Sequence, residues 1–366
     1  MGKRALEAVL AEHQVLVAAD SAFQRRARLL QALWREEHHL PIGVHRGRPL
    51  GSRIDLAHGR QTLAAFLTDG IRAVVREAVL GAGRARDQVI FEDRLFANLL
   101  SSQPLCFNLF GELARDLDLA TRVLRELEPG IARVTSITFE HSPSRGDPRF
   151  TGDRSAFDTF VTYASERGGR GFLGVEVKYH EALGDEPASH RARYDELADA
   201  MACFVPDRAA LRAAPLQQIW RDHLLAGALL AGGEYDEGAF VLLSPRANVA
   251  CERALDRYRA HVSSDATFRT WHLEDFARHL ARATDEAPWT AELEDRYVAF
   301  ERADVLADRE AVSCPRCEAR RPLPIVRGKP HAIGLRMAER GELVLGGCRV
   351  AEDDPAWTCP ACGHAW

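Results

Sequence analysis

The chain has 366 residues, of which 46% are hydrophobic and 28% are charged, and its formal net charge is −5. This composition excludes a disordered or fibrous protein, and the length suggests two or three structural units. Because the net charge is negative, the chain as a whole does not attract nucleic acid, which counts against a protein that passively coats it. An enzyme could still bind phosphate through local basic patches.

The sequence shows no pattern typical of a secretion signal or a membrane span. Its N-terminus leads into an amphipathic stretch, and the longest apolar run, Leu224–Ala231, is far shorter than the roughly 20 residues that a spanning helix needs. We therefore expect a cytoplasmic protein with no membrane association, whose cysteines remain reduced.

The N-terminal part is expected to be a helical region spanning residues 1–85. Apolar periodicity predicts helices over residues 4–38 and 61–79, separated by a breaker-rich stretch at residues 41–52. One side of the first helix carries Arg25, Arg26 and Arg28, which could contact phosphate but are more often a solvated helix face.

The central part, residues 86–308, is expected to form one α/β (α+β) domain. Helical patterns are followed by three β-rich segments, and further helices then alternate with two more strands. This order predicts a mixed sheet flanked by helices, which begins with an antiparallel meander. The expected strands are residues 134–139, 157–163, 172–179, 239–243 and 268–273, and the expected helices include residues 91–100, 104–126, 188–203, 216–230 and 248–261.

A possible catalytic group lies in the third expected strand, where Glu176 and Lys178 fall on one face because side chains alternate along a strand. Such a pair alone is also typical of a solvent-facing strand. Asp158, in the preceding strand, can lie beside Glu176. Two neighbouring carboxylates repel unless a cation lies between them, and their oxygens suit Mg²⁺ or Mn²⁺. With a lysine to orient water and offset phosphate charge, these groups could hydrolyse a phosphodiester.

Two segments that carry these residues, Thr151–Asp158 (TGDRSAFD) and Gly171–Tyr179 (GFLGVEVKY), resemble the PD-(D/E)xK nuclease-like superfamily, in particular a bacterial branch of mostly uncharacterised members. The resemblance extends over about residues 40–280 and includes the segments 102–111 and 139–143. It implies a restriction-endonuclease-like sheet, with Asp158 and Glu176 as ligands of Mg²⁺ (or Mn²⁺) and Lys178 as the catalytic lysine. No proline directly precedes Asp158, which departs from the superfamily pattern.

Other acidic residues near these motifs have alternative roles. Asp153 is a rival for the aspartate, although its Gly-Asp context is typical of a turn. Glu140 could join the catalytic site from the first strand or form an ion pair with an arginine. Many superfamily members add a helical glutamate, for which the candidates are Glu92 and Glu112. The residues after the lysine, His180 and Glu181, could contact the scissile phosphate or have ordinary surface roles.

The last part of the chain, residues 309–366, is expected to be a zinc-ribbon-like domain. It contains two C-x-x-C pairs, Cys314/Cys317 and Cys359/Cys362, which match the four thiolates of a tetrahedral Zn²⁺ site, with a redox dithiol or free thiols as alternatives. Cys348 could be a spare thiol or a substitute ligand. We expect the remaining cysteines to be packing residues: Cys106, Cys203 and Cys251.

The function expected from these features is metal-dependent hydrolysis of phosphodiester bonds, most simply in DNA, in restriction, repair or defence. RNA remains open as a substrate. The alternative is a nuclease-fold binding or scaffolding module with weak or partner-dependent activity, which would bind nucleic acid or a protein through the ribbon or the N-terminal helices. The ribbon carries a basic stripe suited to nucleic acid, made of Arg316, Arg320, Arg321, Arg327 and Lys329.

Overall fold

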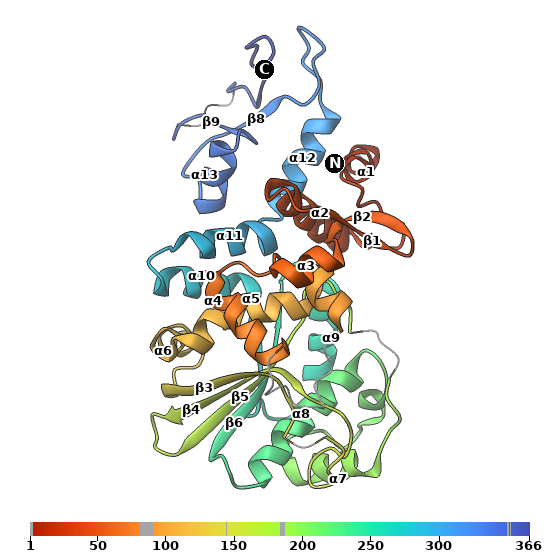
Figure 1. The fold of residues 1–366 in the computed structure, drawn as a ribbon, viewed down its shortest axis with the longest axis vertical. Coiled ribbons are helices and arrows are strands. Elements are labelled where there is room, and N and C mark those ends of the chain that lie inside the picture. The colour runs from red at the N-terminus through yellow and green to blue at the C-terminus, as the bar shows by residue number, and fades with distance from the viewer. Residues whose placement is uncertain (1–2, 81–90, 144, 184–186, 350, 352) are drawn as a thin grey trace. The chain divides into compact units, whose positions relative to one another are not determined.

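The structure is a computed structural model that describes residues 3–80, 91–143, 145–183, 187–349, 351 and 353–366 (Figure 1). The chain forms two compact units. Unit 1 contains Met1–Gly59, Ala97–Leu100 and Ala291–Trp366, and unit 2 contains Arg60–Phe96 and Ser101–Thr290. The first expected boundary, between residues 85 and 86, lies outside the described residues. The division into residues 1–85, 86–308 and 309–366 stays a prediction.

Unit 2 is built on a five-stranded sheet with the order β3-β4-β5-β6-β7. The first three strands pair antiparallel and the last two join in parallel, which confirms the expected meander and mixed sheet. The strands are β3 (Ile131–His141), β4 (Phe157–Ser165), β5 (Arg170–Val177), β6 (Glu237–Ser244) and β7 (Phe268–His272).

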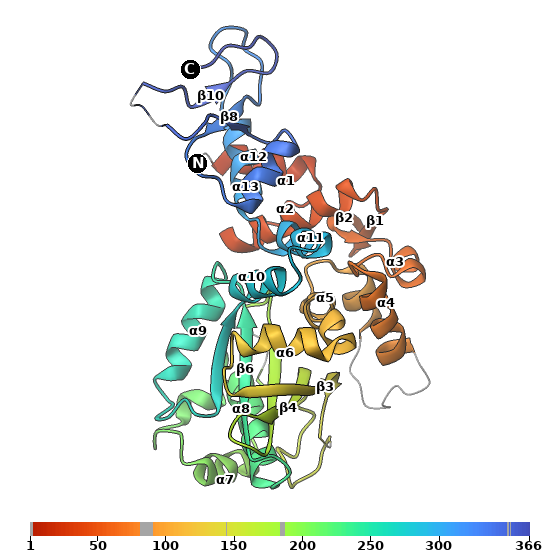
Figure 2. The ribbon, with the colours of Figure 1, turned by 90° about the vertical axis from the view of Figure 1, so that its left-hand side faces the viewer.

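Helices cover both faces of this sheet (Figure 2). One face is covered by α5 (Ser102–Arg115) and α6 (Leu117–Arg125), with α10 (Leu273–Ala283) packed beside α6. The other face packs against α7 (Ala192–Met201), α8 (Leu216–Ala231) and α9 (Val249–Arg259) in one apolar core. Unit 2 also contains α4 (Asp69–Val75), the π-helical turn η1 (Arg76–Leu80) and the 3₁₀ turn η3 (Ala209–Arg212), and the π-helical turn η2 (Asp93–Ala97) ends at the unit boundary.

Two helices bring polar residues to the end of β5. Helix α8 is buried along most of its length because its sequence is largely apolar, and polar side chains in its first half line a cavity beside the sheet. Helix α5 begins at an N-cap, Ser101, whose hydroxyl accepts a hydrogen bond from the Gln103 N–H at 3.2 Å. Gln103 is thereby held in the first turn of α5.

Unit 1 joins segments from both parts of the chain. Its N-terminal elements are α1 (Lys3–Glu12), α2 (Ala22–Glu37), β1 (Ile42–His45) and β2 (Arg48–Ile54), and α3 (Leu56–Thr62) crosses into unit 2. The expected helix over residues 4–38 is interrupted before α2, which starts with a capping box between Ser21 and Gln24. The later elements are α11 (Pro288–Tyr297), which begins just before the unit boundary, α12 (Glu301–Ala311), β8 (Leu323–Val326), α13 (Ala332–Glu339), β9 (Val344–Leu345) and β10 (Trp357–Thr358).

A β-hairpin forms in residues 41–52, where the sequence analysis predicted only a break between two helices. His45 pairs with Arg48, so the loop is Arg46-Gly47, and both loop residues have positive φ, 50° and 78°. That geometry is a two-residue type I′ turn, for which glycine is well suited at the second position.

Arginines are buried in the interior of unit 1. Arg296 lies over the Trp34 ring at 4.0 Å and donates from Nε to Gln31 Oε1 at 2.9 Å. Arg302 is 1% exposed and forms ion pairs with Glu37 and Glu342. Cation–π contact and paired carboxylates offset the cost of removing these charges from water.

Among the described residues, no helix has both the length and the apolar character that crossing a membrane requires.

Candidate active site

Glu176 and Lys178 lie in and just after β5, on the sheet face that α8 covers. They are 7% and 8% exposed, so the E-x-K face is buried instead of solvated. The Lys178 Nζ lies 2.9 Å from Glu176 Oε1. Burial alone would lower the pKa of Lys178, but Glu176, Glu181 and Asp158 outweigh it and raise that pKa above its ordinary value. Lys178 is therefore a protonated, buried cation.

Asp158, at the start of β4, is the cross-strand neighbour of Glu176. Thr159 pairs with Val175 in the antiparallel register, so the adjacent Asp158 and Glu176 share the opposite face. Asp158 Oδ2 accepts a hydrogen bond from the Val177 N–H at 2.8 Å. Burial, followed by the charges of Glu176 and Glu140, raises the pKa of Asp158 well above its ordinary value.

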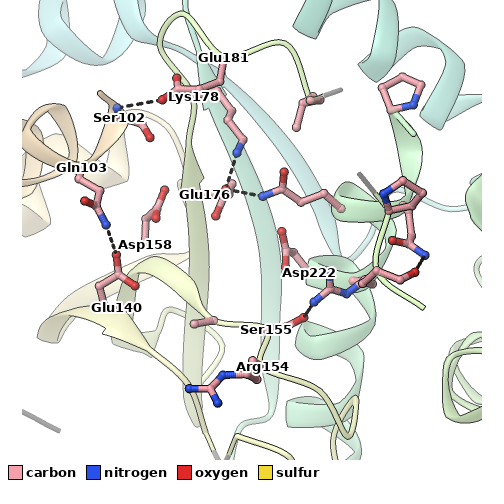
Figure 3. Close-up of a pocket in the computed structure, with 18 of the residues that line it drawn as sticks. Ser102, Gln103, Glu140, Arg154, Ser155, Asp158, Glu176, Lys178, Glu181 and Asp222 are labelled. Atoms are coloured by element: carbon pink, nitrogen blue, oxygen red, sulfur yellow. Dashed lines mark hydrogen bonds and ion pairs between the residues drawn. The ribbon is translucent and has the colours of Figure 1, made fainter. Parts of the chain in front are cut away.

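Glu140 reaches the same cavity from β3 (Figure 3). Its backbone has a φ of 51°, and its Oε1 accepts from Gln103 Nε2 at 3.3 Å. Burial and then the charge of Glu176 raise the pKa of Glu140 to about 7. The structure thus brings together the expected residues Glu140, Asp158, Glu176 and Lys178.

Helix α8 adds two residues that the sequence analysis missed. Gln218 donates from Nε2 to Glu176 Oε1 at 2.7 Å. Asp222 is 5% exposed and lines the cavity, and its Oδ2 has no hydrogen-bond partner among the described residues. Burial and then Glu176 raise the pKa of Asp222 well above its ordinary value. The sequence feature that pairs these two residues is their spacing, because residues four apart lie on one side of a helix.

Asp153, the rival aspartate, accepts hydrogen bonds at both carboxylate oxygens. Its Oδ1 accepts from the Thr151 hydroxyl and the Ser155 N–H at 2.7 and 2.8 Å, and its Oδ2 accepts from Tyr194 and Arg221 at 2.7 and 2.8 Å. Burial opposes ionisation, but the hydrogen bond from Tyr194 and the charge of Arg221 outweigh it and lower the pKa of Asp153. Asp153 therefore fixes Arg221 against the turn before β4.

The carboxylate of Glu181 is likewise engaged by backbone donors. It accepts N–H bonds from Tyr179, His180 and Ser102 at 3.0, 3.1 and 3.1 Å. Burial raises its pKa, but the His180 side chain, Lys178 and the backbone donors outweigh burial and lower it. Glu181 thus ties the end of β5 to the start of α5, and it lines the cavity, whereas His180 is not among the lining residues.

The two expected helical glutamates lie outside the cavity lining. Glu92 pairs with Arg60 at 3.2 Å, and Glu112 accepts from the Thr68 hydroxyl and pairs with Arg115. From the first turn of α5, the cavity is instead lined by Ser102 and by Gln103, whose amide donates to Glu140.

The cavity that contains these groups has a volume of about 360 Å³. Besides the carboxylates, its lining includes Lys178 and four arginines that the sequence analysis did not connect with the site. These are Arg94, Arg145, Arg154 and Arg221. A buried acidic centre in a cavity that arginines also line suits a cation and a phosphate bound together.

The chemistry of the donor set fits a divalent cation. Burial and the neighbouring carboxylates raise the pKa values of Asp158 and Glu140 although cationic side chains lie nearby, and a divalent cation would relieve the repulsion between these carboxylates. Among the described residues, these oxygens do not form a closed set of three or more protein ligands. Mg²⁺ often takes only one or two carboxylates and completes its shell with water and phosphate.

A second group of potential metal ligands lies in unit 1, where four cysteine sulfurs are all within 4.8 Å of one another. The Sγ atoms of Cys314 and Cys362 are 3.7 Å apart, and those of Cys317 and Cys359 are 3.6 Å apart. A tetrahedral zinc with Zn–S bonds of about 2.3 Å requires S–S separations of about 3.8 Å. The four cysteines could therefore form a zinc site.

The remaining cysteines lie apart from this group. Cys348 is exposed and is not one of the four clustered thiols. The three cysteines expected to be packing residues are buried: Cys106, Cys203 and Cys251.

Acidic neighbours pair with much of the expected basic stripe of the ribbon. Arg320 and Arg321 both form ion pairs with Glu310, and Arg327 pairs with Asp354 at 3.2 Å. The N-terminal arginines are similarly engaged, since Arg28 donates to Asp20 and Arg26 pairs with Asp304.

Comparison with known proteins places this geometry in a family. A model of the PD-(D/E)XK nuclease superfamily matches residues 18–299, which is more than half of the chain and includes the whole carboxylate-lysine cavity. No curated protein and no solved structure matched. The chain belongs to the PD-(D/E)XK nuclease superfamily.

Proposed function

We propose that the protein is a Mg²⁺- or Mn²⁺-dependent nuclease that hydrolyses phosphodiester bonds in DNA. The observation that carries the proposal is the convergence of Asp158, Glu176 and Lys178 in one cavity whose lining also contains arginines. Membership of the nuclease superfamily supports the reaction class. Restriction, repair or defence in the cytoplasm is the setting that we propose for it.

Asp158 and Glu176 are the proposed metal ligands, and Glu140 can support them from β3. A bound divalent cation would supply an activated water and neutralise charge on the phosphate. Gln218 is a positioning residue, because its bond to Glu176 fixes the carboxylate while leaving the other carboxylate oxygen for a ligand.

Lys178 acts in this proposal as a cation and hydrogen-bond donor. Against the effect of burial, Glu176, Glu181 and Asp158 raise its pKa, which favours the protonated form, so we assign it the role of a cation and not of a general base. Its charge can offset the negative charge that develops on the phosphate oxygens in the transition state. The arginines at the cavity provide the phosphate contacts that the overall charge of the chain does not.

We assign Zn²⁺ to the four clustered cysteines as a structural ion. In its described residues, the surrounding segment has only short strands, β8 to β10, and one helix of eight residues, α13. So small a unit gains much of its stability from a metal. Because most of the ribbon arginines are paired internally, the proposed DNA contacts lie at the cavity.

Cleavage assays with purified, zinc-loaded protein test the proposal. Supercoiled plasmid, linear duplex, single-stranded DNA and RNA are incubated with Mg²⁺, Mn²⁺ or EDTA, with wild type beside Glu176→Gln. We expect metal-dependent cutting of DNA that falls at least 100-fold in the variant. Glu196→Ala, an exposed change on α7, is the matched control and should cut normally. Absence of cutting with every substrate and metal, or full activity in Glu176→Gln, would overturn the proposal.

A further inference from the structure

An exposed aromatic ring borders the carboxylate cavity. Phe91 is 54% exposed and is one of the residues that line it. The cavity also has an apolar wall, made of Leu183, Pro187, Ala188, Ala214 and Pro215. The catalytic groups themselves need neither feature, because they are charged and act on a phosphate.

Apolar surface beside a phosphodiester site can contact the bases of single-stranded DNA more readily than those of a duplex. In a duplex the bases are stacked inside, and an enzyme that approaches the scissile phosphate meets charged phosphates and sugars. In an unpaired strand the bases are free to turn outward, and an aromatic ring can stack on them regardless of sequence.

Positive groups at two ends of the cavity suit a strand that continues on both sides of the carboxylates. Arg94, close to Phe91 in the chain, lies 3.7 Å from Glu181 at the end of β5. Arg154 lies at the opposite end of the view in Figure 3, with Glu140, Asp158 and Glu176 between it and Glu181. Both arginines are exposed, so each can contact a flanking phosphate.

We propose that the cavity accepts unpaired nucleotides of a DNA strand, with Phe91 stacking on a base and with Arg94 and Arg154 contacting phosphates on either side of the scissile one. This inference rests on the proposed nuclease function and specifies its substrate as single-stranded DNA, including single-stranded segments and frayed ends of a duplex. The ring and the apolar wall provide base contacts, and the arginines provide charge complementarity.

Binding to full-length Lys178→Ala in EDTA tests this inference without turnover. The probes are a fluorescein-labelled single strand and its duplex for anisotropy, and a single strand carrying 2-aminopurine for stacking. We expect tighter binding of the single strand and quenched 2-aminopurine fluorescence. Adding Phe91→Ala should weaken single-strand binding about 10-fold and relieve the quenching, whereas Phe91→Trp should preserve both.

A matched control is Val249→Ala, which changes an exposed apolar residue on α9 outside the cavity lining and should bind like the parent. Equal binding of single strand and duplex, or unchanged single-strand binding in Phe91→Ala, would overturn the inference. If wild type also cuts duplex and single strand equally, with no effect of Phe91→Ala, the nuclease function stands and only the single-strand preference fails. A wild type that cuts no substrate contradicts the nuclease function itself, together with any inference about its substrate.

Discussion

Asp153 and Asp158 are close in sequence but lie in opposite electrostatic environments. Asp153 accepts hydrogen bonds from Tyr194 and Arg221, and its pKa is lowered. Asp158 is buried beside Glu176 and Glu140, and burial followed by these two charges raises its pKa. A carboxylate whose oxygens accept hydrogen bonds from protein donors stabilises the fold. A carboxylate that other carboxylates repel is better suited to binding a cation.

Substitution by asparagine should separate these two roles. In EDTA, Asp153→Asn should lower stability by about 3 kcal/mol, because it leaves Arg221 without its buried partner, which corresponds to a fall in Tm of roughly 6–12 °C. Asp158→Asn removes carboxylate repulsion, so its Tm should equal or exceed that of wild type while cleavage is lost. Thermal unfolding monitored by fluorescence measures the Tm of each variant against that of wild type.

The opposite order of melting temperatures would contradict this assignment. If Asp158→Asn were the strongly destabilised variant and Asp153→Asn still folded and lost cleavage, Asp153 would be the metal ligand.

At the scale of elements, the strands of the site could be predicted but the helical contributions could not. Period-two alternation around Glu176 and the β-rich segment around Asp158 located both strands, and the antiparallel pairing follows from their short connection. Gln218 and Asp222 lie on a largely apolar helix, where their function depends on which side faces β5. That side is set by tertiary packing, which local sequence does not encode.

Three other features of the structure also differ from, or were missed by, the sequence predictions. The Arg46-Gly47 turn lacks the Asn-Gly or Asp-Gly signature of a type I′ hairpin, and Pro49 next to it favours interpretation as a loop. Glu92 and Glu112 were candidates by helix position alone, yet local ion pairs hold both outside the cavity lining. The four arginines of the cavity come from separate segments, so only the fold brings them together.

The two cysteine turns have matching backbones. The residue after each C-x-x-C pair, Glu318 or Gly363, has a positive φ of 58° or 69°, and each turn closes with an N–H bond to the carbonyl of its first cysteine, at 2.9 and 2.8 Å. Such turns direct two sulfurs toward one point, as tetrahedral zinc requires.

We expect purified protein to contain about one zinc ion per chain. Cys362→Ser should remove the ion, whereas Cys348→Ser should retain it because this exposed thiol lies outside the cluster. Elemental analysis of the three proteins, with thiol titration under native conditions, measures this. Wild type free of zinc with all thiols reactive would exclude the assignment.

At the scale of the whole chain, unit 1 joins N-terminal and C-terminal segments. His38, at the end of α2, pairs through Nε2 with Glu292 of α11 at 3.0 Å, and Glu292 also accepts from Trp34. The hydrogen bond to Glu292 raises the pKa of His38, and, against the effect of burial, the bonds from His38 and Trp34 lower the pKa of Glu292. The stability of unit 1 should therefore depend on pH through this pair.

The signs of the two shifts define the pH window. The contribution of His38 to stability is fully present below its unfolded pKa of about 6.5 and is lost as pH rises through its folded pKa. The contribution of Glu292 is fully present above its unfolded pKa of about 4.3 and is lost as pH falls through its folded pKa. The difference in Tm between wild type and His38→Gln should be larger at pH 5.5 than at pH 8.5. Tryptophan fluorescence is a suitable probe, because the Trp34 and His38 rings are 4.5 Å apart.

His45→Gln, at an exposed position on β1, is the matched control and should show no such pH-dependent difference. A Tm difference for His38→Gln that is equal at both pH values would show that the pair adds no pH-dependent stability.

The central claim is that Lys178 assists phosphodiester hydrolysis at a metal centre formed by Asp158 and Glu176. The most direct measurement combines Mn²⁺ titration calorimetry with single-turnover DNA cleavage for wild type and Lys178→Ala. Removing a cation that is bonded to Glu176 should leave Mn²⁺ affinity equal or higher while cleavage falls at least 100-fold. Cleavage within a few-fold of wild type, or lost Mn²⁺ binding in the folded variant, would contradict the claim.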